Sequence, residues 1–458
     1  MPGKPLRDTV APAYLFLCLL LGGSAQGVWV NAVLQLLAVG IIAWAIIAPE
    51  RVDPGVVARR LLAVCTVGLL VILIQLIPLP PELWTALPGR ETVRNGYAIL
   101  GQAPPWMALT LVPDETLSTI LRLLPPTAIL VAIIRLQAYR PAWIAWALLA
   151  GTCSGVILGA LQLASGASPD SPWYHDPFSI FGTAVGFFAN GNLMAILLVA
   201  TLPFLFALLA AGNPEKGKKA FQKRSALLAL SGGLLALILL GLFLNRSLAG
   251  LGLGLPVLAA SAILLARPER QKRWLAAPLL LAMAAIGTIF MLPVSASFQS
   301  LGANESVESR RVIAASSWKA ARDFMPVGAG LGSFPRVYRL YEDPRTVQPS
   351  FVNHAHNDYL EVAVEAGVPG ILWMLLFLFW WGAAAHRRWS EGTGDPFAKA
   401  ATIASAAILT HSLVDYPLRT SALAAVFAMT AGLIARVYYR PPAKTESDIR
   451  PARHLEIR

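Results

Sequence analysis

Two histidines lie at the predicted start of a helix in residues 353–370, NHAHNDYLEVAVEAGVPG. Asn353 is the predicted N-cap and Gly367 the predicted stop, so His354 and His356 would fill the first helical turn. The positive end of a helix favours a neutral imidazole, which can act as a general base, and it also attracts anions such as phosphate. A structural helix start, with both histidines hydrogen-bonded, is the alternative interpretation.

Helical spacing distinguishes the two histidines. His356 would share a face with Leu360 and Val364 and point into the protein, whereas His354 would lie about 200° around the helix. We therefore predict that His356 is the base. The spacing of His354, His356 and Asp358 does not bring three ligands to one helix face, so we expect neither a metal nor another cofactor.

Three arginines could bind an anion. Arg246, in NRSLAGLG, lies in a short connection between two apolar helices, where an unpartnered charge is costly and therefore suggests function. The alternative for Arg246 is snorkelling to the interface. Arg310 and Arg311 are consecutive on a predicted helix, so they diverge by about 100° and one of them should face a cavity. Guanidinium groups bind phosphate oxygens in a bidentate way, so these arginines could hold a pyrophosphate; a solvated helix face is the alternative for the pair.

Other polar motifs lie at predicted helix ends. Asn192, in FFANGNLMA, lies where a loop enters a helix, and its amide either caps that helix or binds glycan hydroxyls. Asp415 and Arg419, in HSLVDYPLR, are four residues apart and are expected to pair with each other or with the arginine cluster, structural pairing being favoured. The run PVGAGLGSF at 326–334 lacks the Lys-Ser/Thr of a phosphate loop, so we predict a tight turn there.

The elements that must position these side chains are membrane helices. Of 458 residues, 56% are hydrophobic and 14% are charged, and the mean hydropathy is +0.61, which excludes a soluble globular domain. Basic residues concentrate in the termini and in alternate loops, so the net charge of +12 marks a cytoplasmic side and requires no nucleic-acid partner. About twelve apolar runs are long enough to cross a bilayer, near residues 10–26, 28–48, 60–77, 117–134, 142–163, 190–211, 225–244, 248–266, 274–292, 368–385, 397–414 and 420–437.

The predicted fold is all-α, a polytopic membrane helix bundle with a periplasmic helical cap. Residues 1–292 would form an N-terminal membrane bundle of about nine transmembrane helices, with an outer loop at 78–115 whose prolines and tryptophans predict short interfacial pieces. Residues 293–367 would form a large periplasmic loop that carries the HAHND motif. The C-terminal transmembrane helices follow at 368–440, and a disordered cytoplasmic tail at 441–458.

Four segments together carry a family resemblance: FFANGNLMA, NRSLAGLG, HAHNDYLEVAVEAGVPG and HSLVDYPLR, all within residues 180–420. They resemble the motifs of the O-antigen ligase/O-antigen polymerase superfamily of bacterial membrane glycosyltransferases. The resemblance implies a metal-independent, inverting transfer of a glycan from an undecaprenyl diphosphate carrier to an acceptor hydroxyl, at the periplasmic face of the inner membrane. It also implies that His356, followed by a supporting Asn357, is the signature histidine, and that Arg246 binds substrate.

The resemblance leaves the acceptor open. Ligases of the superfamily attach O-antigen to lipid A-core, polymerases extend repeat units, and relatives glycosylate protein; the motifs do not separate these activities. An O-antigen ligase with a lipid A-core or glycan acceptor is favoured, and an O-antigen or exopolysaccharide repeat-unit polymerase is the close alternative. A lipid-linked oligosaccharide transporter is less favoured, because the polar motifs cluster on one side and do not line the membrane interior.

Overall fold

The computed structural model describes residues 4–23, 29–48, 53–166, 168, 171–174, 179–212, 218–266, 303–342, 352–390 and 395–436. These residues are mainly helical. The strands among them are β1 (Pro78–Leu79) and β2 (Met107–Ala108), which pair antiparallel with Pro78 opposite Ala108. The all-α prediction is therefore confirmed.

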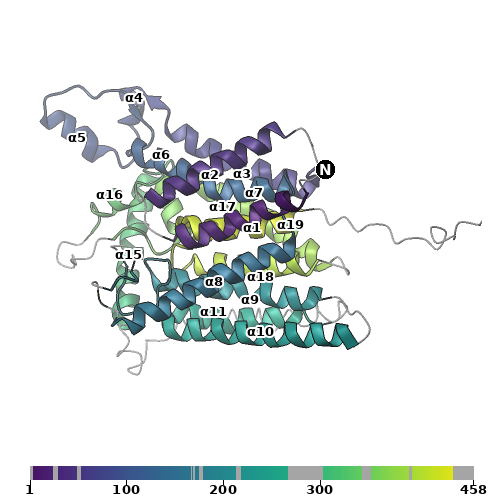
Figure 1. The fold of residues 1–458 in the computed structure, drawn as a ribbon. Coiled ribbons are helices and arrows are strands. Elements are labelled where there is room, and N and C mark those ends of the chain that lie inside the picture. Colours follow the sequence, from purple (N-terminus) through teal and green to yellow (C-terminus); the bar gives the residue numbers. More distant parts are fainter. Residues whose placement is uncertain are drawn as a thin grey trace, which may run out of the picture.

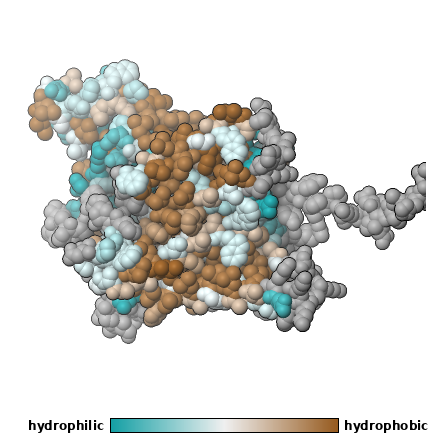
Figure 2. Space-filling view, in the orientation of Figure 1, coloured by the Kyte–Doolittle hydropathy of each residue, from teal (hydrophilic) through white to brown (hydrophobic). Residues whose placement is uncertain are grey.

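The long helices lie side by side in a bundle (Figure 1), and a broad hydrophobic band covers the visible face of the bundle (Figure 2). Seven stretches of the described residues are long and apolar enough to cross a membrane. They are α2 (Trp29–Ile47), α3 (Gly55–Gln75), α6 (Pro113–Arg122) together with α7 (Leu124–Ile134), α8 (Pro141–Ala164), α9 (Gly191–Ala211), most of α10 (Lys218–Asn245), and α17 (Asp358–Ser390). The helices α1 (Lys4–Leu21), α11 (Leu248–Ile263), α18 (Pro396–His411) and α19 (Ser421–Ala435) pack among them.

These helices confirm a polytopic membrane bundle. The number of twelve spans stays a prediction, and the span expected at 274–292 lies outside the described residues. The predicted tail at 441–458 lies outside them as well.

Helix α9 lies at the centre of the bundle because its sequence is apolar on every side. Nearly all of its residues are buried, in contact with α8, α10, α11 and α18. The hydroxyls of Thr152 and Thr201 hydrogen-bond to each other across the α8–α9 contact (2.9 Å), which offsets the cost of burying them. At the start of α9, Asn190 Oδ1 accepts a hydrogen bond from the Asn192 amide (2.9 Å) and caps the helix.

A second hydrophobic core lies between α15 (Ala303–Phe324), α16 (Phe334–Tyr338) and the first turns of α17. Gly367 ends those turns: its φ of 56° and ψ of −143° break α17 into two helices, as the sequence predicted. A Cβ at this position would press against the Pro326 carbonyl, so the break requires glycine. The polar start of α17 thus belongs to a small helical cap, and the apolar remainder belongs to the bundle. The domain boundaries given above stay predictions.

Residues 328–332 form the tight turn that the sequence predicted. Its three glycines all have positive φ. The amide of Ala329 donates to the Val364 carbonyl (2.9 Å), and the amide of Leu111 donates to the Ala329 carbonyl (2.9 Å). The turn therefore joins the first turns of α17 to the segment that precedes α6.

Candidate functional site

Helix α17 begins directly after Asn357, whose Oδ1 accepts a hydrogen bond from the Leu360 amide (3.0 Å) and caps the helix. His354 and His356 precede the helix, and His356 has a left-handed φ of 49°. The predicted N-cap at Asn353 and the helical face assigned to His356 are therefore wrong. The reason is local: a left-handed residue interrupts the helix, and Asn357 supplies a capping oxygen immediately after it.

The His356 ring faces a buried carboxylate. Its Nδ1 lies 3.4 Å from Oδ1 of Asp415, and the two side chains are 23% and 1% exposed. Nδ1 is itself buried, whereas part of the ring is accessible, so Nε2 is the nitrogen available to a substrate. The edge of the ring also contacts Tyr416, with centroids 5.0 Å apart and planes inclined by 67°. The orientation of His356 thus comes from the segment after α18.

Asp415 is the point where several distant segments meet. Its Oδ2 accepts a hydrogen bond from Asn192 Nδ2 at the start of α9 (2.9 Å) and lies 3.3 Å from Nη2 of Arg310 on α15. Its Oδ1 accepts a hydrogen bond from the Tyr416 amide (2.9 Å). Together with His356, these groups surround the carboxylate with donors from four parts of the chain.

The surroundings of Asp415 keep it ionised. Burial alone would raise the pKa of this carboxyl, because an apolar environment penalises the charged form. The contact with His356 and the positive charge of Arg310 outweigh burial and hold the pKa of Asp415 well below its usual range. A permanently negative group at Nδ1 favours the imidazole tautomer that carries its proton there, leaving Nε2 free to accept one.

Arg246 is adjacent to this network in the chain. Ser247 caps α11, accepting a hydrogen bond from the Gly250 amide (3.1 Å), and its hydroxyl donates to Oδ1 of Asn192 (2.7 Å). Arg246 precedes it with a left-handed φ of 57°, and its side chain is exposed. A chain of contacts therefore connects the short α10–α11 turn to His356. It runs from Ser247, next to Arg246, through Asn192 to Asp415. The Asn192 side chain does not cap α9, because Asn190 does so. It hydrogen-bonds to Ser247 and Asp415 instead.

The two consecutive arginines on α15 differ in direction. Arg310 reaches Asp415, with 27% of its side chain exposed. Arg311 is exposed on the adjacent position of the helix. The divergence expected from helical spacing is thus observed, and Arg310 is the member that faces Asp415.

Arg419 lies in a second, separate network. Its guanidinium is 3.4 Å from Asp358, 3.4 Å from Glu361 and 3.0 Å from Glu365, and it is enclosed by protein. Burial would lower the pKa of this group, but the three carboxylates raise it. Asp415 and Arg419 thus take different partners: Asp415 pairs with the arginine cluster, and Arg419 pairs with the acidic face of α17.

His354 belongs to the Arg419 network. Its Nδ1 is 2.9 Å from Oε1 of Glu361, and the Ala355 amide donates to the other oxygen of that carboxylate (2.9 Å). The His354 ring lies over Tyr416, with centroids 4.2 Å apart and an angle of 35° between planes. Both histidines therefore contact Tyr416, but they face different carboxylates: His354 faces Glu361 and His356 faces Asp415.

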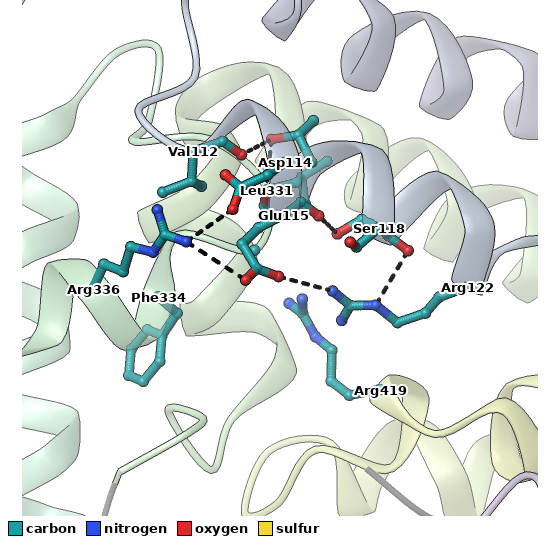
Figure 3. A network of polar contacts seen from close by, with 12 residues as sticks. Val112, Asp114, Glu115, Ser118, Arg122, Leu331, Phe334, Arg336 and Arg419 are labelled. Carbon is teal, nitrogen blue, oxygen red and sulfur yellow. Dashed lines mark hydrogen bonds and ion pairs between the residues drawn. The ribbon is translucent and has the colours of Figure 1, made fainter. Parts of the chain in front are cut away.

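Figure 3 shows a third set of charges beside Arg419. Arg336 on α16 reaches Asp114 (2.9 Å) and Glu115 (3.7 Å), and Arg122 at the end of α6 lies 3.9 Å from Glu115. The Arg122 guanidinium lies close to that of Arg419 (Figure 3). These contacts fasten α6 to the cap, and they include no residue of the Asp415 network.

The sequence interpretation missed the acidic face of α17. Asp358, Glu361 and Glu365 recur at three- and four-residue intervals in an otherwise apolar helix, a signal that could have been found. Glu115 gave no comparable signal for its contact with Arg336, because the two residues lie far apart in the sequence. Among the described residues, no group of three or more His, Cys, Asp or Glu side chains is arranged to hold a metal ion.

Comparison with known proteins gives one match. Residues 222–375 match a family model described as O-antigen ligase. The matched range contains Arg246, Arg310, Arg311 and the two histidines, whereas Asn192, Asp415 and Arg419 lie outside it. No curated protein matches the chain.

Proposed function

We propose, from the match of residues 222–375 to the O-antigen ligase family model, that this chain transfers a glycan from an undecaprenyl diphosphate carrier to an acceptor hydroxyl. The activity is of the ligase type and takes place at the periplasmic face of the bacterial inner membrane. One observation carries the proposal: an ionised, buried Asp415 gathers His356, Arg310 and Asn192 from three separate segments. The reaction needs a base that the acceptor can reach and cations close to that base. His356 is the base, and the arginines are the cations.

His356 acts as the general base. Asp415 holds Nδ1, so the neutral ring accepts the proton of the acceptor hydroxyl at Nε2. The acceptor oxygen forms its bond to the anomeric carbon as the bond from that carbon to the diphosphate oxygen breaks. The electron pair of the broken bond leaves with the diphosphate, and the anomeric centre is inverted.

Arginines stabilise the diphosphate as it gains charge. Arg310 lies close enough to Asp415 to bring a bound phosphate near His356, and Arg246 presents an exposed guanidinium from the adjacent network. Arg311, exposed beside Arg310, is the third candidate. A diphosphate is already a good leaving group, so positioned charge and one base suffice and the mechanism requires no metal.

The test compares two neighbouring histidines. Purified protein in lipid nanodiscs receives an undecaprenyl-diphosphate-linked glycan and, separately, lipid A-core or a second lipid-linked glycan. His356→Ala should lower turnover by about 10²–10⁴, the usual effect of losing a positioned base. His354→Ala is the matched control: it loses a contact to Glu361 and should retain substantial turnover per folded molecule.

Each outcome has a meaning. Transfer to lipid A-core supports a ligase, and transfer to the second lipid-linked glycan identifies the polymerase alternative. Near-native turnover of His356→Ala would remove the base from the mechanism. A native protein that leaves the donor intact with both acceptors would contradict glycan transfer and favour transport. Activity that disappears with EDTA would contradict the metal-independent mechanism.

A further inference from the structure

The turn between α10 and α11 holds Arg246 in an unusual backbone conformation. Because α10 ends at Asn245 and α11 begins at Leu248, only Arg246 and Ser247 connect the two helices. The φ of Arg246 is 57°, in the left-handed region that costs free energy for a residue with a Cβ. Among the described residues, the other non-glycine residues with positive φ are Gln137 and His356. Backbone strain of this kind is retained at functional sites, where the surrounding structure over-determines it.

The guanidinium of Arg246 is available to a ligand. In the part of the chain that the structure describes, this side chain is exposed and makes no hydrogen bond or ion pair. A cation between the ends of two apolar helices is costly without a counter-charge, so an anion is expected there. Snorkelling to the interface is the alternative interpretation. It requires no particular backbone conformation, and so it does not explain the left-handed φ.

Asn245 fixes the chain directly before Arg246. Its side chain is buried, and Nδ2 donates to the carbonyl of Ala184, in the loop that precedes α9 (2.8 Å). Gly191, in the first turn of α9, lies against the same side chain: a Cβ at this position would come within 3.1 Å of Asn245 Nδ2. The end of α10 is therefore packed closely against the start of α9.

Ser247 fixes the chain directly after Arg246. Its oxygen accepts a hydrogen bond from the Gly250 amide (3.1 Å), and its one proton goes to Oδ1 of Asn192 (2.7 Å). Nδ2 of Asn192 donates in turn to Asp415 (2.9 Å). The direction of every hydrogen bond in this series is determined, because a backbone amide can only donate and a carboxylate can only accept.

We propose that Asn245 and Ser247 are positioning residues that hold the backbone of Arg246 in its left-handed conformation. Through Asn192, Ser247 also keeps this backbone at a fixed distance from Asp415. The proposal rests on the diphosphate site of the proposed function and adds the residues that pre-organise it. Pre-organisation raises affinity because less of the chain has to be ordered when the diphosphate binds.

Equilibrium binding of two lipids tests this role without a glycan or an acceptor. The full chain in nanodiscs is titrated with undecaprenyl diphosphate and, separately, with undecaprenol, which has the same hydrocarbon chain and no diphosphate. Bound lipid is quantified by native mass spectrometry. The ratio of the two dissociation constants is the preference for the diphosphate, and it does not change when part of the protein is unfolded.

The variants form double-mutant cycles. Ser247→Ala and Asn245→Ala are measured alone, and each is also combined with Arg246→Ala. Ser261→Ala is the matched control, because Ser261 is a buried serine of the same helix α11 whose hydroxyl donates to the Val257 carbonyl (2.6 Å).

We expect Ser247→Ala and Asn245→Ala each to lower the preference for the diphosphate by about fivefold or more, the cost of ordering one backbone residue again. In the Arg246→Ala background, each should change it by less than about twofold, because the residue through which they act is gone. Ser261→Ala should leave the preference unchanged.

Three outcomes would overturn the positioning role. In the first, Ser247→Ala and Asn245→Ala keep the native preference while Arg246→Ala loses it. In the second, their effects are the same with and without Arg246, and in the third Ser261→Ala has an equal effect. A native protein that binds undecaprenol as tightly as undecaprenyl diphosphate would overturn the diphosphate site of the proposed function as well, so the two failures are distinguishable.

Discussion

Replacing Asp415 by asparagine keeps the shape of the side chain and removes its charge. The native carboxylate is surrounded by donors: Asn192 and Arg310 lie at one oxygen, and Tyr416 and His356 at the other. An amide must turn its NH₂ group toward one of these donor pairs, whichever way it is placed. Both orientations therefore break contacts that the native site makes.

The cost can be worked out from the geometry. Breaking a buried ion pair costs about 3–5 kcal/mol. Arg310 and His356 remain 27% and 23% exposed and are partly solvated, so we expect Asp415→Asn to lower the free energy of unfolding by about 2–4 kcal/mol. Turnover should fall further, by about 10²–10⁴, because His356 loses the group that selects its tautomer.

Stability and turnover are measured separately. The variant and the native protein are compared by thermal unfolding in nanodiscs and by single-turnover glycan transfer with saturating donor, so that kcat is read per folded molecule. Asp114→Asn is the matched control, since it breaks an ion pair with Arg336 (2.9 Å) whose two side chains are both exposed. It should leave turnover unchanged and shift stability by less than about 1 kcal/mol.

The stability difference should also depend on pH. Because the pKa of Asp415 is held below its usual range, its contribution to stability is fully present above the unfolded-state pKa of about 3.9 and is lost as the pH falls through the folded-state pKa. The gap in melting temperature between native and variant protein should be constant near neutral pH and shrink below about pH 4. A variant that melts early yet keeps native kcat would refute the positioning of His356 by Asp415.

Three further substitutions probe other parts of the molecule. Arg246→Lys should lose most of the activity, at least about tenfold in kcat/KM, because an ammonium cannot grip phosphate as a fork; near-native turnover at equal protein levels would remove Arg246 from the diphosphate site. Arg419→Gln leaves three buried carboxylates without their cation and should cost about 3–5 kcal/mol in stability, so an unchanged melting temperature would contradict the assigned network. Gly330→Ala places a Cβ on the side chain of Thr110 at a positive φ, whereas Gly101→Ala meets a positive φ with no atom nearby. The first should therefore lower the melting temperature clearly more than the second, which reports the backbone cost of about 1–2 kcal/mol alone, and equal shifts would contradict the close packing of the 328–332 turn.

Much of the fold could be predicted from sequence because membrane helices obey a simple rule. An apolar run of sufficient length forms a helix in lipid, because a helix pairs the N–H and C=O groups of its own backbone where no water is available. Local turn chemistry was equally readable: Gly367 breaks α17 and the glycines of 328–332 form a turn, because each position needs a backbone that only glycine adopts easily. Both features depend on nearby residues alone.

The arrangement of the site depends on contacts that no local pattern encodes. Asp415 was expected to pair with Arg419 or with the arginine cluster, and spacing could not choose between them. The choice depends on how the 412–420 segment turns: Asp415 faces α9 and α15, and Arg419 faces α17. Similarly, the start of α17 was placed four residues too early, because both Asn353 and Asn357 are suitable caps and a left-handed His356 is not visible in sequence.

Two histidines separated by one residue can have different roles because their rings face different carboxylates. The left-handed backbone at position 356 precedes the helix, and the two rings contact Tyr416 in different ways: the His354 ring is tilted by 35° to it and the His356 ring by 67°. His354 meets Glu361 in a network of three buried carboxylates and Arg419, which fixes the start of α17 in the cap. His356 meets Asp415 in a network whose other members remain partly accessible, which is the condition for binding substrate. The different roles that we propose for the two imidazoles therefore rest on the carboxylate that each ring reaches.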